Sequence, residues 1–425
     1  MKRKWMCLLC TAMLLLTGCQ LMQSGEAESS ISESQAAESQ MQEESSEMAG
    51  ESSIYEESLE ETTEESSEES SEENTEESSE ESSQEEEEVS EAEKTAQQVE
   101  EIMASMTLEE KVGQMFLARM PSSAAYYAEV YQLGGYVLFD VDFNGYTEDQ
   151  VISRIDGCQE VSKIPMIMAV DEEGGTVTRV SDYFRDSIFM SPRNVYAEGG
   201  WAGIVSDTVE KCLLLQSLHL NMNLAPVCDL AEDEYDFMYD RSFSGDAEEA
   251  ANFVGWTVST MKEYNMASCL KHFPGYGNNV DTHTGLAIDY REAEVYYEED
   301  LIPFIEGIEA GADSVLVSHN IVTCFDSEYP ASLSPEIHRI LREELGFNGV
   351  VITDDLVMGA IQDFCGEVDS AVLAVEAGND MLISTDFESQ YQAIMNAINE
   401  GRITEERIDE SVRRILTLKI NMGLM

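Results

Sequence analysis

The chain has 425 residues, of which 86 are acidic and 23 basic, so its formal net charge is −63. This excess of acid argues against nucleic-acid binding, which depends on basic side chains that neutralise phosphates. Length and a hydrophobic content of 43% still allow a large folded domain.

Residues 1–18 are typical of a bacterial export signal. Lys2 to Lys4 give a basic start, and the apolar run from Cys7 to Leu16 is too short to span a bilayer. The run ends in Leu-Thr-Gly-Cys, which resembles the lipobox of bacterial lipoproteins, in which the cysteine is acylated. An ordinary signal peptide with a chance cysteine is the alternative. We expect a lipid anchor at Cys19 that holds the protein on the extracellular face of the cell membrane.

Residues 19–97 are rich in serine and glutamate. Between Gln20 and Ser90 there are 26 glutamates and no Asp, Lys, Arg or His. Such a segment has too little apolar surface to offset its ordering entropy, and its charges repel one another. We expect a disordered tether that reaches into the cell wall, with a specific acidic binding tail as the alternative.

A single folded domain is predicted from residue 98 to residue 425. Apolar residues recur at helical spacing from Val99 to Met106, and Thr107-Leu-Glu-Glu is typical of a capping box. Eight short apolar runs then follow one another as expected strands: Val112 to Leu117, Tyr136 to Phe139, Met166 to Val170, Met222 to Pro226, Ala267 to Leu270, Ser314 to Val317, Gly349 to Ile352 and Asp380 to Ile383.

Segments with helical patterning separate these runs, among them Trp201 to Leu218, Ala247 to Tyr264, Glu294 to Ala310, Pro335 to Leu345 and Ser389 to Asn399. Runs that are apolar on both faces and alternate with helices indicate a parallel sheet covered by helices. Eight such units predict an α/β fold, a (β/α)8 TIM-type barrel. A doubly wound open sheet is the alternative, although no Gly-rich dinucleotide fingerprint follows the first strand. The six cysteines of this domain have no metal-binding spacing, and we expect buried free thiols.

Polar residues follow the expected strands at the end where a barrel places its active site. They are Asp171-Glu-Glu-Gly-Gly and Arg179 after the third, Asp229 and Asp240-Arg-Ser-Phe after the fourth, Lys271-His-Phe-Pro-Gly at the fifth, Ser318-His-Asn at the sixth and Thr353-Asp-Asp at the seventh. Charged groups from five strand ends at one end of a barrel indicate a site rather than a solvated surface.

One of these carboxylates, and a pair in the loop after the fifth strand, suit the chemistry of glycoside cleavage. Asp354 would be a carboxylate held at the barrel mouth, where it could attack an anomeric carbon; the alternative is a helix cap. Asp281 and His283 lie two residues apart in a loop, where the carboxylate could orient the imidazole for proton transfer. An ordinary loop histidine is the alternative for that pair. Arg179, Arg241 and Lys271 suit hydrogen bonds to sugar hydroxyls, or are simply surface charges.

Taken in order, these motifs resemble the single-barrel β-N-acetylglucosaminidases of glycoside hydrolase family 3, from about Val99 to Leu424. The resemblance implies that Asp354 is the nucleophile of a retaining mechanism and that His283, backed by Asp281, is the acid/base. It implies that Asp171, Arg179, Arg241, Lys271 and His272 hold a terminal sugar, that no metal or organic cofactor is needed, and that the protein acts as a monomer. The implied substrates are peptidoglycan fragments or chitooligosaccharides with terminal β-linked GlcNAc.

The chain departs from the common pattern of that family at several positions. Glu172, Thr176 and Tyr276 stand where the family commonly has Gln, Arg and His, and the loop from Lys271 to His283 is one residue shorter. Two other functions are alternatives to hydrolysis: the first is suggested by the histidine, which repels phosphate less than a carboxylate would, and the second by these departures. One is a phosphorylase that releases GlcNAc-1-phosphate, and the other is a wall-binding lipoprotein whose barrel is inactive.

Overall fold

The computed structural model describes residues 90–277, 279, 282, 285, 287–365 and 367–425. The predicted export signal, Cys19 and almost all of the predicted tether lie outside these residues. Helix α1 (Glu91–Met103) begins within the range assigned to the tether, where Ser90 and Glu93 form a capping box. In the part that the structure describes, no helix combines the length and the apolar character that crossing a bilayer requires.

Eight parallel strands form the centre of the domain. They are β1 (Phe116–Arg119), β2 (Gly135–Leu138), β3 (Ile167–Val170), β4 (Met222–Asn223), β5 (Cys269–Phe273), β7 (Ser314–Val317), β9 (Val350–Thr353) and β10 (Met381–Ser384). Their order is β4-β3-β2-β1-β10-β9-β7-β5, and parallel bridges from Met222 to Ala267 and from Val227 to Lys271 connect the two edges. This closure confirms the predicted barrel and excludes the open doubly wound sheet.

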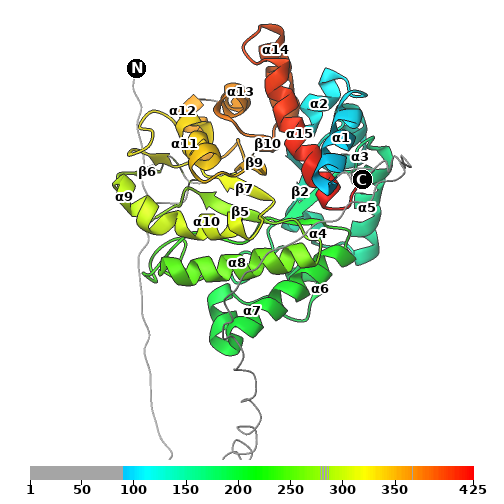
Figure 1. Cartoon of the computed structure of the whole chain (residues 1–425). Helices are drawn as coiled ribbons and strands as arrows, with labels where there is room; N and C mark the ends of the chain where they lie inside the picture. The colour runs from blue at the N-terminus through cyan, green and yellow to red at the C-terminus, as the bar shows by residue number, and fades with distance from the viewer. Residues whose placement is uncertain (1–89, 278, 280–281, 283–284, 286, 366) are drawn as a thin grey trace, which may run out of the picture. The chain divides into compact units, whose positions relative to one another are not determined.

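Helices surround the strands (Figure 1). They are α2 (Leu108–Gln114), α3 (Ala124–Tyr131), α4 (Asp140–Phe143), α5 (Glu148–Val161), α6 (Ser181–Phe184), α7 (Pro192–Ser217), α8 (Ala247–Glu263), α9 (Ala293–Val295), η1 (Tyr296–Asp300), α10 (Ile302–Glu309), η2 (Ala331–Leu333), α11 (Pro335–Arg339), η3 (Ile340–Glu344), α12 (Gly359–Cys365), α13 (Glu367–Ala377), α14 (Phe387–Asn399) and α15 (Glu405–Asn421). A small separate sheet pairs β6 (Ile288–Asp289) with β8 (Ile321–Val322).

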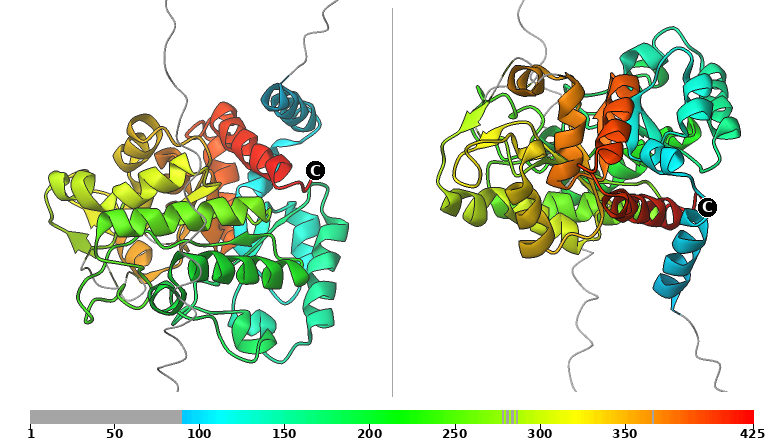
Figure 2. Two further views of the ribbon diagram at one scale, coloured as in Figure 1. Left: turned by 60° about the horizontal axis from the view of Figure 1, so that its bottom comes forward. Right: turned by 90° about the horizontal axis from the view of Figure 1, so that it is seen from above.

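The helices cover the barrel as packed neighbours. Helix α8 packs between α7 and α10 on one flank, where the three lie side by side (Figure 2). At the chain ends, α1 and α2 pack against α15, so the first and last helices lie together. The strand residues face into the core on one side and these helices on the other, which is why every residue of β2, β3, β7, β9 and β10 is buried.

The first predicted strand is wrong in its bounds. Residues 112–114 belong to helix α2, and the strand begins only at Phe116. The reason is the predicted capping box itself: Thr107 Oγ1 accepts the N–H of Glu110, and Glu110 accepts the N–H of Thr107 at 3.0 Å. A helix that starts there continues for two turns before the chain enters the sheet.

The expectation of buried thiols holds for four of the six cysteines. None of the six within the described residues forms a disulfide; four are buried, whereas Cys324 and Cys365 are partly exposed. Burial raises the pKa of Cys158 to about 11 and the pKa of Cys269 to about 12, so these thiols stay protonated at neutral pH.

Candidate active site

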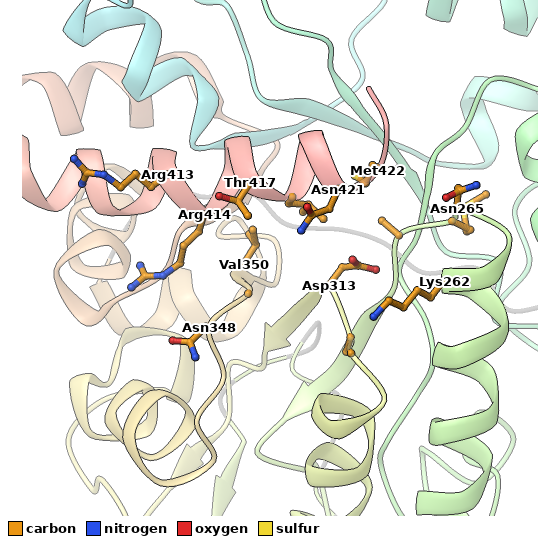
Figure 3. A pocket seen from close by; sticks show the side chains of 16 residues that line it. Lys262, Asn265, Asp313, Asn348, Val350, Arg413, Arg414, Thr417, Asn421 and Met422 are labelled. Atoms are coloured by element: carbon orange, nitrogen blue, oxygen red, sulfur yellow. The ribbon is translucent and has the colours of Figure 1, made fainter. Parts of the chain in front are cut away.

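Cavities lie at both ends of the barrel. The one at the N-terminal ends of the strands has a volume of about 610 Å³ and is drawn in Figure 3, where Arg413 and Arg414 extend from α15 and Lys262 from α8. Its charges already serve the fold, because Arg413 pairs with Glu100 at 2.6 Å and Arg414 pairs with the buried Asp380 at 2.9 Å. This end of a barrel commonly contributes stability rather than catalysis.

The second cavity, with a volume of about 740 Å³, opens at the C-terminal ends of the strands. Its lining includes every described residue of the predicted site: Asp171, Arg179, Arg241, Lys271, His272 and Asp354. The structure therefore brings together side chains from β3, β5, β9 and the segment after β4. Asp281 and His283, predicted as the proton-transfer pair, lie outside the described residues.

Asp354 follows the last residue of β9. Its backbone N–H donates to the carbonyl of Val317 in β7, which extends the pairing of the two strands by one residue. Its carboxylate accepts the N–H of Asp355 at 2.8 Å, so one oxygen is oriented by the backbone. The side chain of Asp355 turns toward β10, where it accepts the Thr385 hydroxyl at 2.6 Å. Both carboxylates line the cleft, and that of Asp355 is held by Thr385.

A network of four charged side chains forms the floor of the cleft. Lys271 Nζ lies 2.6 Å from Asp171 Oδ1 and 2.6 Å from Glu173 Oε1. Arg241 donates two hydrogen bonds to Glu173, from Nε at 2.9 Å and from Nη2 at 2.7 Å. Such bidentate geometry fixes the guanidinium plane. Two cations and two carboxylates thus balance one another in a buried region.

The electrostatics of Glu173 and Lys271 follow from this pairing. Burial opposes ionisation of Glu173, but Arg241 and Lys271 more than offset it, so the pKa of Glu173 lies well below its ordinary value. Burial also opposes the charge on Lys271, and Asp171 and Glu173 more than compensate, so the pKa of Lys271 is raised. Glu173 and Lys271 are therefore both charged at neutral pH and are held in place by their partners.

His272 is held by a second buried carboxylate. Its Nδ1 lies 2.7 Å from Asp229 Oδ2, and its backbone N–H donates to the same oxygen at 3.0 Å. On the other side of the ring, Arg241 Nη2 lies 3.2 Å from Nε2. Asp229 on one side and Arg241 on the other thus hold the imidazole ring in a fixed orientation.

Arg179 reaches the cleft from a loop that Glu172 organises. Glu172 is fully buried and accepts the backbone N–H groups of Arg179 at 2.9 Å and Val180 at 2.7 Å, as well as the hydroxyl of Ser181. The Nε of Arg179 is buried and has no hydrogen-bond partner among the described residues. The guanidinium itself donates from Nη1 to the carbonyl of Thr178 at 3.1 Å, and the side chain lines the cleft.

Two residues of this site have no individual role in the sequence prediction. Glu173 is the common partner of Lys271 and Arg241, and Asp229 orients His272. Glu173 comes shortly after β3 and Asp229 lies in the segment after β4, and such positions are a signal that sequence analysis could use. Their roles as hydrogen-bond acceptors depend, however, on which basic side chains the fold places beside them. His319, which follows the sixth strand of the prediction, is fully buried, and the carbonyl oxygen of Asp355 lies 3.1 Å from its Nε2.

No group of three or more metal-binding side chains occurs among the residues that the structure describes. Two carboxylates of the cleft, Asp171 and Glu173, are paired instead with Lys271 and Arg241.

Comparisons with known proteins agree with this geometry. Residues 107–418 match the glycosyl hydrolase family 3 N terminal domain. A beta-hexosaminidase of Xanthomonas oryzae pv. oryzae (strain MAFF 311018) is 33% identical over 257 residues, which are 59% of this chain and 76% of the relative. A beta-hexosaminidase of Xylella fastidiosa (strain M23) is likewise 33% identical over 257 residues, with the same shares of the two chains.

Among solved structures, a glycoside hydrolase family 3 beta-N-acetylglucosaminidase from Paenibacillus sp. str. FPU-7 superposes with a TM-score of 0.71 at 32% identity. The match covers 75% of this chain and 63% of that one, so this chain spans less than two thirds of that protein. The beta-N-acetylhexosaminidase from Beutenbergia cavernae DSM 12333 gives a TM-score of 0.65 at 25% identity, over 74% of this chain and 98% of that one. The family match covers most of the chain and includes every described residue of the cleft, and the chain therefore belongs to glycosyl hydrolase family 3.

Proposed function

We propose that this protein is a retaining exo-β-N-acetylglucosaminidase that removes terminal β-linked GlcNAc from peptidoglycan fragments or chitooligosaccharides. The observation that carries the proposal is the convergence of Asp354 with the network of Asp171, Lys271, Glu173 and Arg241 in one cleft. The names of the beta-hexosaminidase and beta-N-acetylglucosaminidase relatives support the choice of sugar.

In the proposed mechanism, the terminal sugar lies on the charged floor with its hydroxyls bonded to Asp171, Lys271 and Arg241, and the side chain of Arg179 lines the same cleft. An oxygen of Asp354 attacks the anomeric carbon as the bond to the leaving oxygen breaks. His283, oriented by Asp281, gives its proton to that oxygen. A water molecule then attacks the same carbon, loses a proton to His283 and releases Asp354, so the β configuration is retained.

Trapping of the glycosyl-enzyme intermediate tests the proposal. A fluorinated GlcNAc derivative that slows breakdown of the intermediate should add one sugar to the protein, and peptide mapping by mass spectrometry should locate it on Asp354. Asp354→Asn should form no adduct and should lose turnover of a chromogenic β-GlcNAc substrate by several orders of magnitude. A label on another residue, or an inactive wild type that only binds GlcNAc, would overturn the proposal.

The same assay separates hydrolysis from phosphorolysis. When inorganic phosphate is added to the assay, the enzyme should release GlcNAc and no GlcNAc-1-phosphate. Formation of GlcNAc-1-phosphate would overturn hydrolysis as the reaction. The β-glucose counterpart of the chromogenic substrate should be cleaved much more slowly. We also propose that the enzyme acts from the outer face of the cell membrane, anchored through lipid on Cys19, with the acidic segment as its spacer.

A further inference from the structure

Tyr276 occupies a special place beside the proposed nucleophile. It lines the cleft, is only 2% exposed, and its ring packs edge-on against His272 with the centroids 5.2 Å apart. Burial, and after it the negative charge of Asp354, raises the pKa of the Tyr276 phenol far above its ordinary value. The group is therefore a hydroxyl that can donate a hydrogen bond at any pH at which the enzyme works.

The backbone on both sides of Tyr276 is tightly constrained. Its N–H donates to Asp229 Oδ1 at 2.8 Å. The flanking Gly275 and Gly277 have φ values of +125° and +55°, which favour glycine. A Cβ at these two positions would lie 2.6 Å from Asp300 Oδ1 and 2.6 Å from the guanidinium carbon of Arg291, respectively.

Asp300 and Arg291 form an ion pair of 2.8 Å, so the contacts beneath the turn are themselves held in place. The backbone that carries Tyr276 therefore has little freedom to shift, and the position of its hydroxyl is fixed.

That hydroxyl bonds the side-chain hydroxyl of Thr282. Thr282 is fully buried, and its carbonyl accepts the N–H of Ala360 at 3.3 Å. In the sequence, Thr282 lies between Asp281 and His283, and Ala360 lies shortly after Asp354. One residue thus connects the turn of Tyr276, the proton-transfer loop and the segment that carries the nucleophile.

We propose that Tyr276 and Thr282 are positioning residues that set the distance between the acid/base His283 and the nucleophile Asp354. The inference rests on the proposed function and names the device that holds its proton donor in place. Neither hydroxyl reacts; their bond connects Thr282, the sequence neighbour of His283, to the turn that Asp229 holds. Tyrosine at position 276, where the family commonly has histidine, supplies the phenol on which this bond depends.

Leaving-group dependence tests the inference, because proton donation matters only when the leaving group is a poor one. Tyr276→Phe keeps the aromatic ring and removes the hydroxyl. Thr282→Val keeps the size of the side chain and removes the hydroxyl that bonds Tyr276. For each, kcat/KM with chitobiose should fall about 100-fold, in the range typical of general acid catalysis. With dinitrophenyl β-GlcNAc, whose leaving group needs no proton, kcat/KM should fall less than about threefold. The parameter kcat/KM is the appropriate one because it reports on the first chemical step.

Two control variants separate positioning from general structural damage. Thr282→Ser keeps a hydroxyl and should restore most of the chitobiose activity lost in Thr282→Val. Tyr136→Phe removes another buried tyrosine hydroxyl, which donates to the carbonyl of Ala124 at 2.8 Å away from the cleft, and should leave both substrates unaffected.

His283→Ala distinguishes failure of the inference from failure of the proposed function. If His283→Ala shows the leaving-group effect while Tyr276→Phe and Thr282→Val slow both substrates equally or neither, the positioning role is wrong and the proposed mechanism stands. If His283→Ala itself shows no such effect, the proposed acid/base is wrong and the inference fails with it.

Discussion

The side chain on which most of the cleft depends is Glu173, a carboxylate between two cations. Its exchange for glutamine keeps the shape but removes the charge that Arg241 and Lys271 share. A buried charge that loses its partner typically costs about 3–5 kcal/mol. We therefore expect Glu173→Gln to lower the free energy of unfolding by an amount of that order, measured by urea denaturation, and to reduce kcat/KM for a β-GlcNAc substrate at least 100-fold.

An exposed carboxylate provides the matched control for that substitution. Glu336 pairs with Arg339 at 2.7 Å at the protein surface, where water screens the charges. Glu336→Gln should therefore leave both stability and kcat/KM close to those of the wild type. If Glu173→Gln behaved like Glu336→Gln, the network would contribute neither to the fold nor to binding.

Individual residues also show how far the sequence could predict the site. Asp354, Lys271 and Asp171 could be chosen because each follows or ends an apolar run, and the structure places all three at one cleft. The role of Glu173 could not be read in this way, because it depends on Arg241 arriving from a segment 68 residues away. Contacts of such long range leave no local pattern in the chain.

Helix α15 contains a lysine in an unusual environment. Lys419 is fully buried, and its Nζ donates to the neutral Gln114 Oε1 of α2 at 2.7 Å. Burial lowers the pKa of Lys419 from 10.5 to about 7. Between these two values the unfolded chain holds a proton that the folded chain has released. The contribution of Lys419 to the free energy of unfolding therefore rises with pH in that window, by about 1.4 kcal/mol per unit, and is constant below it.

Lys419→Met should remove this slope, since methionine has similar length and no charge. Chemical denaturation at several pH values between 7 and 9.5 would measure the free energy of unfolding of both proteins. The difference between wild type and Lys419→Met should grow with pH. Lys94→Met, which changes an exposed lysine of α1, should keep the wild-type slope. Parallel pH profiles for wild type and Lys419→Met would show that the buried amine does not titrate in this range.

The start of the barrel shows why the bounds of a helix or strand are harder to predict than its type. The run from Val112 to Leu117 is apolar throughout, and an apolar run suits a buried strand and a buried helix equally. The capping box at Thr107 decides for helix, and the chain changes to strand only at Phe116. Later runs such as Ser314 to Val317 have no competing helix signal, and there the predicted and observed strands coincide.

The closed barrel brings the ends of separate strands together at one cleft. The parallel strands of the barrel end at the same rim, so residues that are hundreds of positions apart meet over one cleft. The opposite rim has its own charges, but Asp380 and Glu100 bind Arg414 and Arg413 there. Paired charges thus stabilise both ends of the barrel, and only the end with the cleft also carries the groups proposed for catalysis.

The chain as a whole is predicted to act on a surface rather than in free solution, and Cys19 is the residue that tests this. Attachment of two or three acyl chains gives firm membrane binding, because each buried CH₂ contributes about 0.8 kcal/mol. In a bacterial host that processes lipoproteins, wild-type protein should sediment with membranes and incorporate a labelled fatty acid. Cys19→Ser should lose the label and move to the soluble fraction.

The barrel is the part that carries the chemistry, so kcat of Cys19→Ser toward a soluble β-GlcNAc substrate should equal that of the wild type. Cys10→Ser is the matched control: it makes the same exchange within the predicted export signal, and that protein should still sediment with membranes. Equal fractionation of Cys10→Ser and Cys19→Ser would contradict the anchor, and it would leave the acidic segment without its proposed role as a spacer between membrane and enzyme.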